Sequence, residues 1–114
     1  MRVFNQTRGT ELGGQIDVAD TSEKRRQGLL KHTGLATGEG LWIAPTESVH
    51  SFGMKFTIDV VYLNKQRQVV KLRPQLVPRR ISFCLKAYSV LELPAGQIAA
   101  TGTTVGDQLT FEGR

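Results

Sequence analysis

The sequence predicts an α+β domain with a mostly antiparallel, barrel-like β-sheet of seven or eight short strands and one or two short helices. Its 114 residues are the size of one domain, spanning residues 1–114. Short apolar or alternating segments recur along the chain, separated by glycine and proline residues typical of turns. These segments rarely alternate with long helical ones, which argues against a doubly wound parallel sheet.

The first half of the chain is predicted to hold three strands and one helix. The strands lie over residues 2–5, 15–19 and 41–44. Pro45 ends the third strand because proline cannot donate a hydrogen bond to a ladder. The helix begins after Thr21 or Ser22, either of which suits an N-cap, and runs to about Leu30.

The second half is predicted to be almost entirely strands and turns. Its clearest strand lies over residues 57–63, and a turn leads from it into a returning strand over residues 68–72. Pro74 and Pro78 bound a loop that cannot be a central strand. After Pro94 we expect a short turn or helix. Further strands are expected over residues 81–85, 88–93 and 108–111.

Composition excludes several classes of protein. Apolar residues make up 39% and charged residues 22%, as in soluble globular chains and not disordered ones. The single cysteine, Cys84, excludes an intramolecular disulfide and a zinc site built from several thiolates. The N-terminal residues lack the apolar stretch of an export signal, and no apolar run approaches a membrane span. We therefore expect a cytoplasmic protein with no membrane contact, no metal and no cofactor.

The net charge is +5, and the positive excess lies in one segment, residues 60–91. This basic segment contains no acidic residue and seven cations: Lys65, Arg67, Lys71, Arg73, Arg79, Arg80 and Lys86. If the cations shared one face, that face would attract phosphates, so weak nucleic-acid binding through residues 65–86 is one hypothesis. The alternative is that they solvate strand edges and block aggregation.

Several motifs follow one another in a recognisable order. They are EKRRQGLL at residues 23–30, SFGMKFTIDVVY at residues 51–62, VLELPAG at residues 90–96, and Gly106-Asp107. Over residues 15–111 this pattern resembles the family called domain of unknown function 192. The resemblance implies a small β-rich α+β domain of prokaryotes, and it implies no particular reaction. The family often has a tryptophan just before the Met-Lys pair, where this chain has Gly53.

The motif residues predict a binding cleft. We place seven of them at this candidate site: Arg25, His50, Phe52, Met54, Lys55, Asp59 and Glu92. His50, Phe52 and Met54 follow at intervals of two, so an extended segment would turn them to one face together with Phe56. His50 and Lys55 would then lie at the rim. The alternative is that the apolar members simply fill the core.

Two acids, Asp59 and Glu92, lie on predicted strands beside apolar neighbours, and a buried acid needs a partner. Held roughly 5–10 Å apart, they could act as the general acid and base of an enzyme. Held separately, Asp59 would accept backbone N–H groups or pair with Arg25 or Lys55. Glu92 would then pair with another basic residue. The sequence leaves both arrangements open.

Taken together, these features favour a non-enzymatic binding or accessory domain for a small or anionic ligand. A hydrolase-like enzyme that uses Asp59 and Glu92 is the second hypothesis, and nucleic-acid binding through the basic segment is the third. We assign no catalytic residue and no metal ligand. The sequence leans away from an enzyme without deciding the question.

Overall fold

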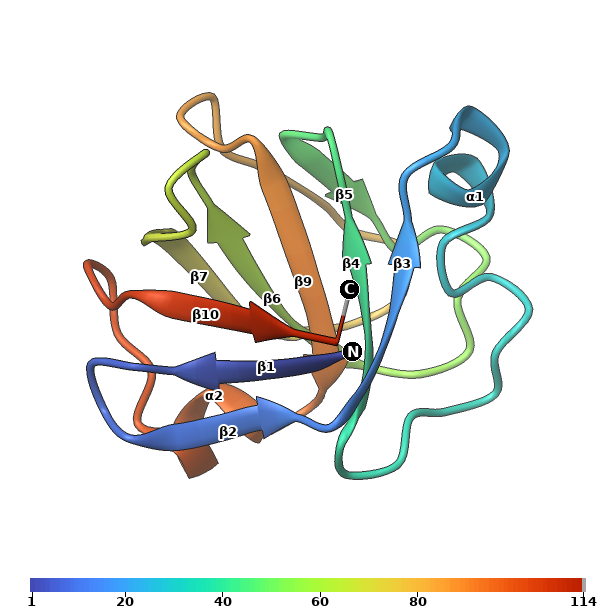
Figure 1. Cartoon of the computed structure of the whole chain (residues 1–114). Coiled ribbons are helices and arrows are strands. Elements are labelled where there is room, and N and C mark those ends of the chain that lie inside the picture. The colour runs from blue at the N-terminus through green and yellow to red at the C-terminus, as the bar shows by residue number, and fades with distance from the viewer. Residues whose placement is uncertain (114) are drawn as a thin grey trace.

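The computed structural model describes residues 1–113, and over that range the chain forms ten strands and two short helices (Figure 1). The strands are β1 (Arg2–Asn5), β2 (Thr10–Gly13), β3 (Gln15–Ala19), β4 (Glu39–Ile43), β5 (Ser48–His50), β6 (Ile58–Leu63), β7 (Val69–Leu76), β8 (Ile81–Phe83), β9 (Ser89–Pro94) and β10 (Leu109–Glu112). The helices are α1 (Ser22–Gln27) and α2 (Gln97–Thr101).

The strands form three separate sheets. The central sheet has the order β3-β4-β9-β6-β7, a second sheet has the order β10-β1-β2, and β5 pairs with β8. Only β3 and β4 run parallel, and α1 lies in the long connection that parallel neighbours require. The predicted α+β class with mostly antiparallel strands is therefore confirmed. The barrel-like closure is wrong, because β3 and β7 remain the edges of the central sheet.

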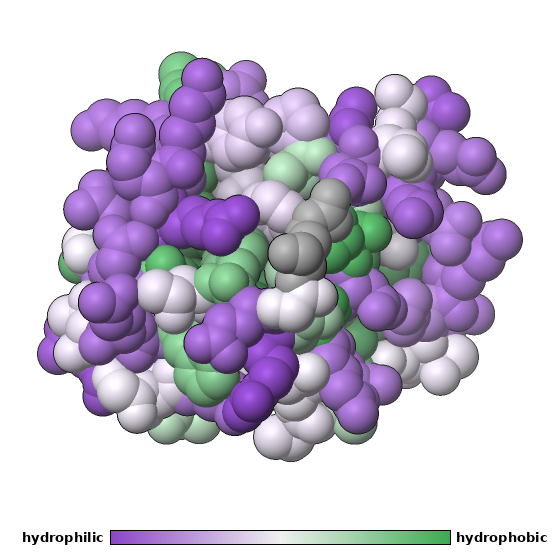
Figure 2. Space-filling model, viewed as in Figure 1, coloured by the Kyte–Doolittle hydropathy of each residue, from purple (hydrophilic) through white to green (hydrophobic). Residues whose placement is uncertain are grey.

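The central sheet separates two hydrophobic cores. The first core lies between this sheet and the β10-β1-β2 sheet with α2, and contains Val3, Leu12, Ile16, Trp42, Ala44, Val61, Leu63, Val69, Leu91, Leu93, Ile98 and Leu109. The second core lies on the opposite face and contains Ala19, Leu29, Leu41, Ile43, Val49, Met54, Ile58, Val60, Tyr62, Leu76 and Val90. Because both faces are covered, every residue of β6 is buried. Hydrophilic side chains cover most of the face shown in Figure 2.

The β5–β8 ribbon covers part of the second core. Val49 of β5 faces inward, and the Tyr62 hydroxyl donates a 2.9 Å hydrogen bond to the Ser82 hydroxyl of β8. This bond satisfies a buried phenol and holds the ribbon against the central sheet. Burial raises the pKa of Tyr62, and the neighbouring Ser82 hydroxyl, which can donate a hydrogen bond to the phenolate, partly opposes that rise.

Several element boundaries differ from those predicted. The helix ends at Gln27, before Leu30, because Gly28 adopts a positive φ of 48°. Strand β7 runs through Pro74. An edge strand tolerates proline, which lacks an N–H, at positions whose backbone faces away from the neighbouring strand. Strands β2 and β5 were not predicted, because β2 does not alternate and leads into the Gly13-Gly14 pair, and β5 has Val49 as its single apolar residue.

The predicted extended segment through His50, Phe52, Met54 and Phe56 is also wrong. Strand β5 ends at His50, and Gly53 adopts a φ of +82° in the turn that follows. The turn sends Phe52 outward, where it is 50% exposed, and Met54 inward, where it joins the second core. Three residues predicted to share one face are therefore divided between solvent and core.

Candidate functional site

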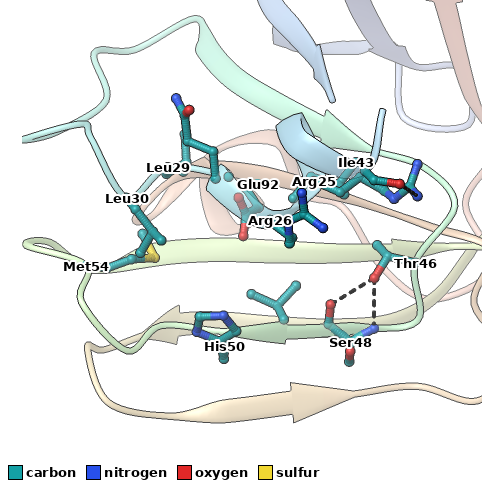
Figure 3. A pocket seen from close by; sticks show the side chains of 14 residues that line it. Arg25, Arg26, Leu29, Leu30, Ile43, Thr46, Ser48, His50, Met54 and Glu92 are labelled. Atoms are coloured by element: carbon teal, nitrogen blue, oxygen red, sulfur yellow. Dashed lines mark hydrogen bonds between the residues drawn. The ribbon is translucent and has the colours of Figure 1, made fainter. Parts of the chain in front are cut away.

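A cavity of about 640 Å³ opens between α1 and the second-core face of the central sheet (Figure 3). Its lining comes from four places: α1 with the residues that follow it, the end of β4, β5 with the loops before and after it, and one residue of β9. The lining residues are Ser22, Arg25, Arg26, Gln27, Gly28, Leu29, Leu30, Ile43, Thr46, Ser48, Val49, His50, Met54 and Glu92. Apolar side chains form part of the wall, namely Leu29, Leu30, Ile43, Val49 and Met54, and most of the other lining residues are polar or charged.

Glu92 is the acidic residue of this cavity. It lies opposite Leu41 of β4 and Val60 of β6, so its side chain faces the second core together with theirs. The residue is only 3% exposed, and no hydrogen bond or ion pair joins its carboxyl group to any other residue in the range 1–113. Burial raises the pKa of Glu92 to about 7. Near neutral pH this carboxyl group therefore changes charge readily.

The basic residues of the cavity come from α1. Thr21 caps the helix by accepting a 3.2 Å hydrogen bond from the Lys24 backbone N–H. The Arg25 guanidinium donates to the Asp20 carbonyl and the Ser22 hydroxyl, at 3.1 and 3.4 Å. Arg26 makes no ion pair with another described residue. Neither arginine lies within ion-pair distance of Glu92, so the cavity holds positive and negative groups apart.

Strand β5 supplies the wall opposite α1. Figure 3 shows His50 and Ser48 on this strand, across the cavity from Arg25 and Arg26. The Thr46 hydroxyl donates to the Ser48 carbonyl at 3.1 Å and accepts from the Ser48 N–H at 3.4 Å. These two bonds satisfy backbone groups on the strand edge that β8 does not pair. His50 is exposed at the rim, and its ring lies 6.2 Å from that of Phe52.

Four of the seven predicted site residues line this cavity: Arg25, His50, Met54 and Glu92. Phe52 and Lys55 are exposed and are not part of its lining. Asp59 lies elsewhere. The sequence reasoning missed Arg26 and Ser48, although the available signals were simple. Arg26 follows Arg25 within the same motif, and Ser48 alternates with His50 along a strand.

Asp59 is a structural residue on the opposite face of the central sheet. It lies opposite Leu93, faces the first core and is fully buried. Its two carboxylate oxygens accept hydrogen bonds from the Gln75 N–H at 3.0 Å and the Ile98 N–H at 2.8 Å. Asp59 thereby joins an irregular part of β7 to the start of α2. It has no access to Glu92, so the structure does not form the hypothetical carboxylate pair.

The cations of the basic segment do not share one face. Arg67 lies over the Phe111 and Trp42 rings, 4.2 and 5.5 Å from their centroids, on the first-core side. Lys71 lies 5.6 Å from the Tyr62 ring on the second-core side, and its ammonium group donates to the Phe83 carbonyl. The charge is therefore spread around the edge of the sheet. Nucleic-acid binding by this segment stays a prediction.

Other site types find little support in the described part of the chain. Within residues 1–113 no cluster of three or more His, Cys, Asp or Glu side chains could hold a metal ion. None of the helices in that range has the length and apolar character needed to cross a membrane. Cys84 is a half-buried free thiol.

Comparison with known proteins places the chain in a family. A UPF0127 protein of Pyrococcus furiosus is 32% identical over 119 residues, covering 96% of this chain and 97% of that protein. Two crystal structures match with TM-scores of 0.82 at 20% identity, and each match covers 96% of this chain. One is a protein of unknown function from Novosphingobium aromaticivorans, of which 82% is covered. The other is a proposed transcription regulator from Sinorhizobium meliloti, of which 89% is covered.

At 20% identity the two crystal structures show that the fold is shared. The family assignment comes from a family model, described as "Uncharacterized ACR", that matches residues 3–111. The match extends over nearly the whole chain and confirms the resemblance found in the sequence motifs. The chain therefore belongs to the family named domain of unknown function 192.

Proposed function

We propose that this protein is a non-enzymatic binding domain that holds a small anionic ligand in the cavity between α1 and the second core. The observation that carries the proposal is the make-up of that cavity. Arg25, Arg26 and His50 lie around one space of about 640 Å³, whose lining also includes the buried Glu92. Such a volume is typical of small-molecule sites, which range over roughly 300–1,000 Å³.

The lining chemistry supports binding of a small molecule. Leu29, Leu30 and Met54 supply apolar contact area, and the two guanidinium groups supply donors suited to a carboxylate or phosphate. Polar groups set among apolar contacts fix a ligand's orientation in such sites. The cavity therefore has both a surface for affinity and charged groups for selectivity.

Catalysis by a carboxylate pair has less support. Glu92 faces the cavity, whereas both oxygens of Asp59 are occupied by backbone N–H groups on the other side of the sheet. A general acid and base must both reach the substrate. We place the binding activity in a reducing, cytoplasmic compartment, in keeping with the lone free Cys84.

The test is a thermal-shift screen with small anions, followed by calorimetry on those that stabilise the protein. The panel contains inorganic phosphate, acetate, succinate, ethyl phosphate and 3-phosphoglycerate. A ligand that binds only the folded chain raises Tm by mass action. We expect at least one anion to bind, and Arg26→Ala to weaken it by about tenfold or more because a charged hydrogen-bond donor is lost.

Arg79→Ala is the matched control, because Arg79 is an exposed cation outside the cavity lining. It should leave the affinity unchanged. Equal weakening by Arg26→Ala and Arg79→Ala would overturn the proposed site, since the binding would then depend only on overall charge. Failure of every anion in the panel, and of every zwitterionic acid tested in the same way, to bind would overturn the proposed function.

A further inference from the structure

We propose that the ligand of this cavity is zwitterionic, with a protonated amine that forms an ion pair with the Glu92 carboxylate while its acidic group meets the arginines of α1. This inference rests on the proposed function and deepens it. It assigns Glu92 a direct role in binding and names the chemical class of the ligand, a small amino acid or aminoalkyl phosphate.

The Glu92 carboxyl group is buried in the cavity wall without a partner from the described residues. It is 3% exposed, yet no group within residues 1–113 donates a hydrogen bond to it or forms an ion pair with it. Buried polar groups are almost always hydrogen-bonded, and a buried charge without a partner is costly. Because Glu92 is part of the cavity lining, a ligand can supply the missing partner. An ammonium group forms a charge-assisted hydrogen bond with a carboxylate, roughly twice as strong as a hydrogen bond between neutral groups.

The positive and negative groups of the cavity are separated: the arginines belong to α1, and Glu92 belongs to the central sheet. Arg25 is held back by its bonds to the Asp20 carbonyl and the Ser22 hydroxyl, close to its own helix. The arginines therefore leave Glu92 unpaired while lining the same space. A molecule with an acid at one end and an amine at the other complements both groups at once. A simple anion would leave Glu92 buried without a partner.

The surroundings of Glu92 determine how binding depends on pH. The titratable and charged groups on its side of the central sheet include Arg25 and Arg26 on α1, His50 on β5, Tyr62 on β6, Lys71 and Arg73 on β7, Cys84 after β8 and Asp17 on β3. Asp17, the other acid, is exposed at the sheet edge. At low pH the Glu92 carboxyl group carries a proton, and an ammonium group can form an ion pair with it only after that proton has been lost. Zwitterion affinity should therefore increase by about tenfold between about pH 6 and pH 8.

The experiment measures calorimetric affinities for matched pairs of probes. Glycine, β-alanine, 4-aminobutyrate and 5-aminopentanoate are each compared with the same acid lacking the amine, and O-phosphoethanolamine is compared with ethyl phosphate. We expect one zwitterion to bind at least about tenfold tighter than its amine-free analogue. Affinities are compared as a ratio within each pair, because any contribution common to both members of the pair then cancels.

Glu92→Gln should bring the ratio of zwitterion affinity to amine-free affinity close to one, since a neutral amide cannot form an ion pair with an ammonium ion. Asp17→Asn, which removes an exposed acid, should leave it unchanged. Should Glu92→Gln not fold, Glu92→Asp keeps the charge on a shorter side chain, and the preferred amino acid should become one methylene longer. If the amine-free analogues bind as tightly as the zwitterions and Arg26→Ala weakens both, the inference fails while the proposed function stands. If no zwitterion binds, the inference also fails, and the anion panel decides the proposed function separately.

Discussion

Asp59 and Glu92 lie on adjacent strands of one sheet, and their carboxyl groups face opposite hydrophobic cores. The reason is the register of β6 and β9, in which Asp59 lies opposite Leu93 and Val60 lies opposite Glu92. Both residues are buried, but their partners differ. Asp59 accepts two backbone hydrogen bonds. Glu92 lines a cavity, and its carboxyl group accepts no hydrogen bond from another residue in the range 1–113. Two acids with similar sequence surroundings thus serve structure in one case and a candidate binding site in the other.

Removing one acceptor from Asp59 should destabilise the fold. In Asp59→Asn, one of the two N–H groups, from Gln75 or Ile98, loses its acceptor because an amide has only one oxygen. We expect the free energy of unfolding to fall by about 2–4 kcal/mol, measured by urea denaturation. Asp17→Asn, at an exposed position, should change it by less than about 0.5 kcal/mol. Equal stabilities of the two variants would contradict the structural role of Asp59.

Glu92 should make the protein less stable as the pH rises. Burial raises the pKa of Glu92 from 4.5 to about 7, so the folded chain binds this proton more tightly than the unfolded chain. The resulting stabilisation is complete below about pH 4.5 and is lost as the pH rises through about 7. At 1.36 kcal/mol per pKa unit, the free energy of unfolding should fall by about 3 kcal/mol over this range.

Urea denaturation at several pH values, on wild type and Glu92→Gln, measures this effect. The glutamine side chain resembles the protonated acid and cannot titrate, so the fall with pH should be absent in the variant. If the free energy of unfolding varied with pH in the same way for both proteins, Glu92 would not be the source of the pH dependence.

Asp107 should have the opposite effect on stability. Burial by itself would raise the pKa of Asp107, but hydrogen bonds from Asn5, Arg8 and Thr104 outweigh it and hold the pKa below its usual range. A carboxyl with a lowered folded-state pKa stabilises the fold above its unfolded value of 3.8, and this contribution is lost as the pH falls.

Asp107→Asn should therefore lower the free energy of unfolding at neutral pH by about 2–3 kcal/mol, because charge-assisted hydrogen bonds are lost. The gap between variant and wild type should narrow as the pH falls below about 4. Thermal unfolding followed by circular dichroism over this pH range tests both expectations. A gap that stays constant with pH would argue against a titrating Asp107.

Gly40 should not tolerate a side chain. A Cβ at this position would lie 2.7 Å from the Glu92 carbonyl oxygen, a backbone atom that cannot move without shifting β9. Gly40→Ala should therefore destabilise the protein by about 1–3 kcal/mol, as overpacking usually does. Gly34→Ala is the matched control, since a Cβ there meets nothing within 4 Å. The measurement is Tm for each variant, and a Gly40→Ala protein as stable as Gly34→Ala would contradict the close approach of β4 and β9.

Much of the fold could be predicted because local patterns specified it. Alternation along residues 57–63 places Asp59 and Val61 on one face and Val60 and Tyr62 on the other, and the two hydrophobic cores agree with this division. Strands β2 and β5 escaped prediction because β2 does not alternate and leads into the Gly13-Gly14 pair, and β5 has Val49 as its single apolar residue. The extended segment after His50 failed because Gly53 turns the chain there, and a glycine alone does not show which φ it adopts.

Sequence patterns were sufficient to identify the family, the α+β class and the alternation that assigns each acid to one face of its own strand. Whether those two faces coincide depends on the folded sheet, because the register between β6 and β9 is set by contacts across the whole sheet. A register one residue different would have put Asp59 and Glu92 on the same face. The cavity is likewise a tertiary property. It brings together Arg25 and His50, which are distant in sequence, because α1 and β5 both pack on the second core.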